Sequence, residues 1–302
     1  MSRVANWSKW MPLNGAGRNQ EIPGSNGLYR VRVKGTEKVI YIGETGGRGG
    51  LRERLGSLSR GIYQPNEMPY RDPHTAAPAL WAFRHRDKVD YEVSVSVFSG
   101  SKEDRNMLEA VELALHRSLY GSSPSCNFGR MPRGYKMSSK SDANLRGGPT
   151  EQEQSSWTQG CSPIGRLDQE VTSKTWCGHS WTNWESLERM SKLRKSKDEG
   201  LYRIRSEGAS KLIYIGRGNI IDRLKAHFSS IKNKELVKGQ IFAKFSPLEA
   251  SFTVLNPNSR ALYLRHQMEE LETDLIGAHG LGVDLLPEAQ FKSGKIPAAK
   301  KQ

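Results

Sequence analysis

The chain has 302 residues, enough for two ordinary domains, and carries 46 Lys and Arg against 32 Asp and Glu, a net charge of +14. This basic surplus favours a polyanionic partner such as nucleic acid, although charge alone equally fits a basic protein without one. No run of eighteen apolar residues exists and the N-terminus is too polar for a signal peptide, so we expect no membrane partner and a cytoplasmic location. The three cysteines form no CxxC pair, which argues against a disulfide framework or a zinc knuckle.

The sequence pattern of a strand, a turn and a second strand occurs twice in the chain. GLYRVRVKGTEKVIYIG occupies 27–43, and EGLYRIRSEGASKLIYIG occupies 199–216. In each copy apolar residues alternate with arginines, which predicts a half-buried strand with a basic second face. WSKWMPL at 7–13 also matches WTNWESL at 181–187, so whole units are repeated rather than one hairpin.

The predicted elements that follow the hairpin have the same order in both units: a helix, a third strand and a long helix. Leucine or isoleucine stripes at helical spacing mark the first helix, YEVSVSVFSG and EASFTVLN supply the third strands, and the long helices cover about 102–120 and 259–278. We therefore predict the α+β fold class, with each domain a small, mainly antiparallel three-stranded sheet flanked by helices. The predicted domains are 1–135 and 176–302, joined by a flexible polar linker over 136–175.

The order of these residues, GLY and YIG in paired strands, then an Arg in a helix and a Glu in a later helix, resembles the GIY-YIG nuclease superfamily. Eleven residues separate the two tyrosines in each unit. The resemblance implies two GIY-YIG-like domains that hydrolyse phosphodiester bonds, each with one divalent metal. The catalytic residues implied are Tyr29, Tyr41, Arg54, Glu112 and Asn127 in the first unit, and Tyr202, Tyr214, Arg223, His227 and Glu272 in the second.

Phosphodiester hydrolysis needs a deprotonated water, stabilisation of charge on phosphorus and help for the leaving oxygen. By resemblance, Tyr29 is the base or positions the water. An ordinary tyrosine pKa is near 10, so Tyr29 can act as the base only if a cation or a metal lowers that pKa. A guanidinium such as Arg54 can donate two parallel hydrogen bonds to phosphate oxygens. Glu112 and Glu272 are the expected ligands of Mg²⁺ or Mn²⁺, which prefer oxygen.

Glu109 competes with Glu112 for the metal. Glu112 is preferred because Glu112-x-x-Leu115 aligns with Glu272-x-x-Leu275 and because it lies one turn after Leu108, at the edge of the buried stripe.

Both units depart from the family pattern. The first has Leu58 where the second has His227, and His74 could either stand in for that histidine or serve in a turn. The second lacks the Pro-x-x-Asn ending, and Asp284 sits about where the Asn is expected.

Several arginines are candidates for DNA contacts. Those of the first strands lie on the basic face, one lies in 68–86, and two lie in the basic segment after Asn127. For 68–86 the alternative is an insertion that covers the sheet, and for the later segment it is a solvated tail. The candidates are Arg30, Arg32, Arg71, Arg130, Arg133, Arg203 and Arg205.

The duplication suggests a DNA endonuclease in which two covalently joined domains act as a single-chain pseudo-dimer on the two strands of a duplex. Such a chain needs no further protein partner and can act as a monomer. One alternative is a nickase, in which domain 1 cuts and a degenerate domain 2 holds DNA. Another is a nucleic-acid-binding protein that kept the fold without the chemistry.

Overall fold

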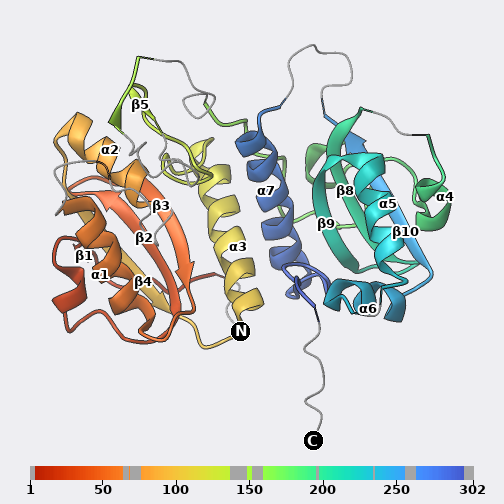
Figure 1. Ribbon diagram of the computed structural model, residues 1–302, viewed down its shortest axis with the longest axis horizontal. Coiled ribbons are helices and arrows are strands. Elements are labelled where there is room, and N and C mark those ends of the chain that lie inside the picture. Colours follow the sequence, from red (N-terminus) through yellow and green to blue (C-terminus); the bar gives the residue numbers. More distant parts are fainter. Residues whose placement is uncertain are drawn as a thin grey trace, which may run out of the picture. The chain divides into compact units, whose positions relative to one another are not determined.

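The computed structural model describes residues 4–63, 68, 76–136, 148–151, 159–194, 197–233, 235–255 and 263–295. The chain divides into two compact units, Met1–Ser162 and Pro163–Gln302. Each unit contains a four-stranded antiparallel sheet with helices, so the predicted α+β class is confirmed (Figure 1). Within the described ranges, no helix combines the length and the apolar composition needed to cross a membrane.

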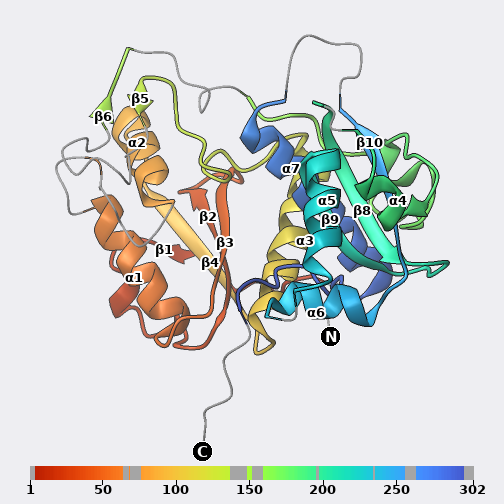
Figure 2. The ribbon, with the colours of Figure 1, turned by 45° about the vertical axis from the view of Figure 1, so that its right-hand side comes forward.

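Unit 1 is built around the predicted hairpin, whose strands are β2 and β3. The sheet order is β1-β4-β2-β3, which leaves β3 at one edge. The helices α1 and α2 pack together, and α3 packs along β3 (Figure 2). The elements are β1 Met11–Pro12, β2 Gly27–Val33, β3 Val39–Thr45, α1 Gly50–Tyr63, α2 Ala77–Asp87, β4 Tyr91–Val97, α3 Lys102–Tyr120, β5 Tyr135–Lys136 and β6 Gly148–Pro149, with a short 3-10 helix at Ala16–Arg18.

Unit 2 repeats this topology, with sheet order β7-β10-β8-β9 and β9 at the edge. Even the bulge recurs, since the register shifts after Val31 in β2 and after Ile204 in β8. The elements are β7 Glu185–Ser186, α4 Leu187–Ser191, β8 Glu199–Ser206, β9 Leu212–Asn219, α5 Ile220–Ser230, α6 Val237–Lys244, β10 Leu248–Val254 and α7 Arg265–Val283, with a 3-10 helix at Trp176–Gly178.

The prediction of three strands per sheet is wrong, because each unit has a fourth. The repeated WxxW segment contributes it: Met11 pairs with Val93 in unit 1, and Glu185 pairs with Ala250 in unit 2. Each of these strands has only two residues, too short for alternation to reveal it in the sequence.

The tryptophans of the WxxW segments cover the basic face of each sheet. The Arg30 guanidinium lies 4.6 Å from the ring centre of Trp7 and 4.8 Å from that of Trp10. In unit 2 the Arg203 guanidinium lies 4.3 Å from Trp181, with Trp184 at 4.7 Å. Stacking on aromatic faces lets arginine be buried while it remains charged. This face is therefore part of the packed interior.

The predicted flexible linker over 136–175 is wrong in its last part, where the chain packs onto unit 2. Ile164 and Val171 are buried there. The backbone N–H of Ile164 donates to Asp274, and the Arg203 guanidinium donates to the carbonyl of Val171 at 2.6 Å. A single guanidinium that donates hydrogen bonds to several backbone carbonyls can order a segment that has few apolar side chains.

The long helices α3 and α7 correspond with a constant offset of 163 residues. They begin at 102 and 265 and end at 120 and 283, and the next residues, Gly121 and Asp284, both adopt positive φ. Asp284 therefore caps the helix, a conformation that Asp tolerates better than most residues. It is not the counterpart of Asn127. By the same offset, Glu272 corresponds to Glu109 rather than to Glu112.

Candidate active site

Two tyrosines meet at the edge strand of each unit. The ring centres of Tyr29 and Tyr41 are 5.9 Å apart, and those of Tyr202 and Tyr214 are 6.1 Å apart. All four side chains are buried. The structure thus brings together the tyrosines that the sequence predicted as pairs.

The glycine that ends each YIG triplet makes this pairing possible. A Cβ on Gly43 would lie 2.7 Å from the Tyr41 ring and 2.8 Å from the Tyr29 hydroxyl. On Gly216 it would lie 2.4 Å from the Tyr202 hydroxyl. Since such separations are inside van der Waals contact, only glycine leaves room for both phenols.

In unit 1, Arg54 and Glu109 come to the tyrosines from two different helices. Arg54 lies on α1 and hydrogen-bonds to Tyr29. Glu109 lies on α3 and interacts electrostatically with Arg54 and both tyrosines. The two helices can reach the cluster because β3 is the edge strand of the sheet formed by the described residues.

Burial governs the protonation of this cluster. Desolvation raises the pKa of Tyr29 to about 12, although the nearby Arg54 opposes the shift. Desolvation and the charge of Glu44 raise the pKa of Glu109 to about 8. At neutral pH Tyr29 is therefore a phenol that can orient a water, and Glu109 is mostly a neutral carboxylic acid, whose ionised form a bound cation would stabilise.

The structure corrects the choice of Glu112, which faces a different part of unit 1. Its carboxylate accepts from the backbone N–H of Ala5 at 2.6 Å and from the Trp7 indole N–H at 3.2 Å. Glu112 therefore holds the N-terminal segment. Glu109 takes the place beside the tyrosines, because three residues along a helix turn the side chain onto a neighbouring face.

Asn127 does not face the tyrosines either. Its amide oxygen accepts from the Ile42 N–H at 3.0 Å, and its amide nitrogen donates to the Ile42 carbonyl at 2.8 Å. These backbone groups lie on the open edge of β3, so Asn127 completes the edge as a neighbouring strand would. In unit 2 the Gln290 side chain accepts from the Ile215 N–H at 3.0 Å, in the same role. The ending of unit 2 is thus Pro287-x-x-Gln290.

The cluster of unit 2 gathers all five residues predicted for it. The Tyr202 hydroxyl lies 2.9 Å from His227 Nε2 and 3.4 Å from Arg223 Nε, which donates to it. Burial and two cationic neighbours lower the pKa of His227 to about 3, so the imidazole is neutral and can accept the Tyr202 proton. Glu272 interacts electrostatically with both tyrosines.

The carboxylates of the two clusters have different partners. Arg217 donates to Glu272 at 3.0 Å and to Glu269 at 2.6 Å. The residue in the place of Arg217 in unit 1 is Glu44, which pairs with Arg105 at 3.1 Å. Glu109 forms no ion pair with any residue that the structure describes. Both Glu44 and Arg217 directly follow the YIG glycine, a signal that the sequence carried.

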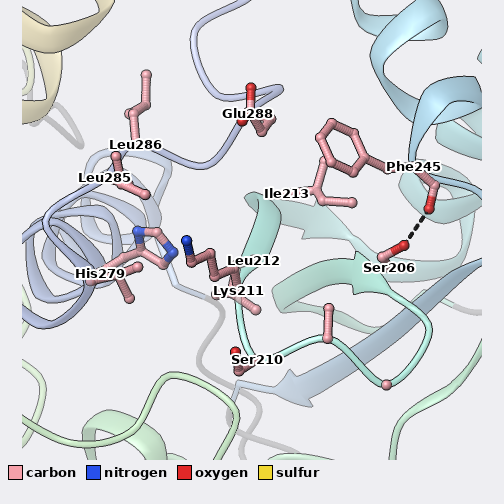
Figure 3. Close-up of a pocket in the computed structure, with 13 residues that line it drawn as sticks. Ser206, Ser210, Lys211, Leu212, Ile213, Phe245, His279, Leu285, Leu286 and Glu288 are labelled. Atoms are coloured by element: carbon pink, nitrogen blue, oxygen red, sulfur yellow. Dashed lines mark hydrogen bonds between the residues drawn. The ribbon is translucent and has the colours of Figure 1, made fainter.

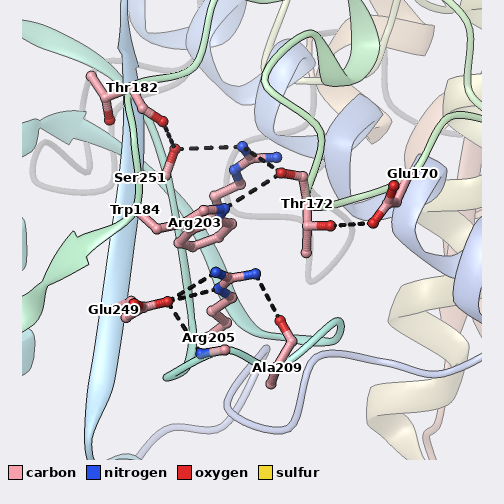
Figure 4. A network of polar contacts seen from close by, with 10 residues as sticks. Glu170, Thr172, Thr182, Trp184, Arg203, Arg205, Ala209, Glu249 and Ser251 are labelled. Atoms are coloured by element: carbon pink, nitrogen blue, oxygen red, sulfur yellow. Dashed lines mark hydrogen bonds and ion pairs between the residues drawn. The ribbon is translucent and has the colours of Figure 1, made fainter.

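Four of the arginines predicted to bind DNA are held inside the fold. Arg32 pairs with Glu92 at 2.9 Å, Arg205 pairs with Glu249 at 3.0 Å, and Arg30 and Arg203 stack on tryptophans. Figure 4 shows Arg203 and Arg205 enclosed by Trp184, Ser251 and Glu249. The tryptophans of the WxxW segments cover these four arginines, which argues against their predicted role in binding DNA.

The other candidates for DNA contact have different positions. Arg133 is exposed and Arg130 is half-buried in the segment after Asn127. Arg71 and His74 lie outside the described residues. In the insertion, α2 packs against α1 and buries Leu80, Trp81 and Phe83 in the unit 1 core.

A pocket of about 410 Å³ opens beside the cluster of unit 1. It lies between the end of β3 and the start of α1, and Arg54 and Glu44 line it with the glycine-rich loop 45–50. Unit 2 has a larger pocket of about 530 Å³ at the β8–β9 turn and the end of α7, lined by residues that include Lys211, Phe245 and His279 (Figure 3). No residue of the tyrosine cluster lines that second pocket.

A divalent metal fits the unit 1 cluster on the chemistry of its donors. Glu109 is a half-buried carboxyl group whose ionised form a bound cation would stabilise, and Glu44 lies nearby in an ion pair with Arg105. Both side chains offer the oxygen atoms that Mg²⁺ and Mn²⁺ prefer. No group of three or more metal-binding side chains occurs among the residues described. Mg²⁺ commonly uses one or two carboxylates and completes its shell with water and phosphate oxygens.

No protein-family model matches the chain, and no curated protein or solved structure is significantly similar to it.

Proposed function

We propose that the chain is a metal-dependent DNA endonuclease of the GIY-YIG type, with its cutting site in unit 1. The observation that carries the proposal is the meeting of Tyr29, Tyr41, Arg54 and Glu109 at one sheet edge, beside an open pocket. The recurrence of Tyr, Tyr, Arg and Glu in unit 2, at corresponding positions, makes a chance arrangement a poor explanation.

In this mechanism the phosphodiester enters the pocket and is gripped by Arg54, whose guanidinium can donate to two phosphate oxygens. Glu109 would hold the Mg²⁺ or Mn²⁺ ion, with Glu44 beside it; when bound, the metal supplies charge stabilisation for phosphorus and for the leaving oxygen. The Tyr29 hydroxyl orients the attacking water, since its raised pKa keeps the proton in place at neutral pH.

The duplex then receives one cut per binding event, which is the nickase arrangement rather than the symmetric pseudo-dimer. The support for this choice is that Glu272 already holds the guanidinium of Arg217, whereas Glu109 forms no ion pair with a cation in the described part of the chain. A metal would have to displace Arg217 before Glu272 could bind it.

The test is cleavage of supercoiled plasmid with and without Mg²⁺, comparing Glu109→Gln with Glu112→Gln. We expect nicked circles, loss of nicking by at least about 100-fold in Glu109→Gln, and nicking within about threefold of wild type in Glu112→Gln. The second variant is a matched control on the same helix. Equal loss in both variants, or no cleavage by the wild type with either metal, would contradict the proposal.

A further inference from the structure

The cluster of unit 2 contains three basic side chains, and one of them, Arg217, lies where unit 1 has a carboxylate. Arg217 occupies the place of Glu44, Lys238 comes from α6, and Arg223 corresponds to Arg54. We propose that unit 2 is a metal-independent phosphate-binding site, in which Arg217 is the resident cation of Glu272. This inference rests on the proposed function, because it names what the second copy does on the same DNA.

Arg217 forms ion pairs with two carboxylates of α7. Its guanidinium bridges Glu272 at 3.0 Å and Glu269 at 2.6 Å, and all three side chains are about a quarter exposed. A guanidinium that already satisfies both carboxylates opposes entry of a divalent cation by charge repulsion and by loss of the existing bonds. In unit 2 the guanidinium of Arg217 therefore takes the place that a divalent cation would have beside Glu272.

Lys238 adds a second cation beside the tyrosine pair of unit 2. Its ammonium lies 4.2 Å from the ring centre of Tyr214, and it interacts electrostatically with Arg223 and Glu272. It is half-buried, and Arg223 is exposed. Three cations thus face two carboxylates around one tyrosine pair, an excess of positive charge that suits a phosphate diester.

His227 lies buried behind Arg223 and contacts the same tyrosine hydroxyl. Its Nε2 is occupied by the Tyr202 hydroxyl at 2.9 Å, and Arg223 Nε donates to the same hydroxyl. Arg223 also hydrogen-bonds to Tyr214, so the tyrosine pair fixes the position of its guanidinium. Proteins usually bind a nucleic-acid backbone, without recognising its bases, through direct contacts of lysine and arginine with the phosphates.

The first experiment counts metal ions by titrating Mn²⁺ into the full chain and following free Mn²⁺ by electron paramagnetic resonance. We expect one ion per chain, lost in Glu109→Gln and retained in Glu272→Gln. Two ions, one of which disappears in Glu272→Gln, would overturn the inference while leaving the proposed nuclease intact.

The second experiment measures binding of a fluorescent duplex in EDTA, where no metal can contribute. Lys238→Ala should weaken binding about fivefold to tenfold and lower the salt dependence by about one phosphate contact. Lys244→Ala is the matched control, because Lys244 is an exposed lysine on the same helix that lies against Phe245. Equal small losses in both variants would overturn the site in unit 2, and they would not bear on cleavage by unit 1.

Discussion

The two units share a backbone plan and differ in how they balance charge at one position. After the YIG glycine, unit 1 has Glu44 and unit 2 has Arg217. In unit 1 the strand carboxylate pairs with Arg105 on the long helix, and in unit 2 the strand guanidinium pairs with Glu269 and Glu272 on the corresponding helix. One reversal of sign thus leaves Glu109 open to a cation and closes Glu272. Two copies of a fold can thus keep the same residue types in one place and surround them with different charges.

The largest predicted difference between the two units concerns the corresponding residues Arg54 and Arg223. We expect Arg54→Ala to lower the nicking rate by about 100-fold to 1,000-fold, because it removes the donor to the reacting phosphate. Arg223→Ala should lower DNA affinity by about tenfold and leave the rate at saturating DNA within about threefold. Single-turnover cleavage over a range of protein concentrations separates the rate from the affinity.

Reversed behaviour, with the rate lost in Arg223→Ala and retained in Arg54→Ala, would move the cutting site to unit 2. Loss of the rate in both variants, together with a linear product in the wild type, would restore the symmetric pseudo-dimer.

Smaller effects, on stability, are expected at Asn127 and Gln290, whose side chains hydrogen-bond to the edge strands. Asn127→Ala removes two buried hydrogen bonds to Ile42 and should lower the free energy of unfolding by about 2–3 kcal/mol. Gln290→Ala removes one bond to Ile215 and should cost about 1–2 kcal/mol. Urea unfolding of the three proteins measures both. If Asn127→Ala abolished cleavage without destabilising the protein, Asn127 would be a catalytic residue after all.

The smallest effect concerns acid stability and separates His227 from Leu58, its counterpart in unit 1. The pKa of His227 is about 3 in the folded state, against an ordinary value of 6.5. Between these values the unfolded state binds more protons, so the free energy of unfolding falls as the pH falls below 6.5. At pH 5 this loss is about 2 kcal/mol.

His227→Leu should remove that part of the acid sensitivity, although it costs the bond to Tyr202 at every pH. The measurement is urea unfolding at pH 7.5 and pH 5 for both proteins, since only the difference between the two pH values reports the titration. His279, whose pKa burial lowers to about 4, contributes in the same direction and stays unchanged in the variant. An unchanged difference would show that His227 does not resist protonation.

The sequence by itself determined the duplication, the hairpin strands, the pairs of tyrosines and the arginines that follow them. These features depend on local alternation and on the glycines at 43 and 216, whose necessity is steric. The helix predicted at about 102–120 from its apolar stripe is confirmed, and in the structure the Ser101 cap and Gly121 mark its ends.

Only the tertiary structure decided which charged residue faces which partner. Glu109 and Glu112 both lie on α3, and the choice between them depends on how that helix packs along β3. The fourth strand, the arginines buried under tryptophan and the Gln290 brace all arise from contacts between segments far apart in the chain. The physical reason is that a charge is stabilised by whatever lies opposite it in space, and local periodicity carries no information about that neighbour.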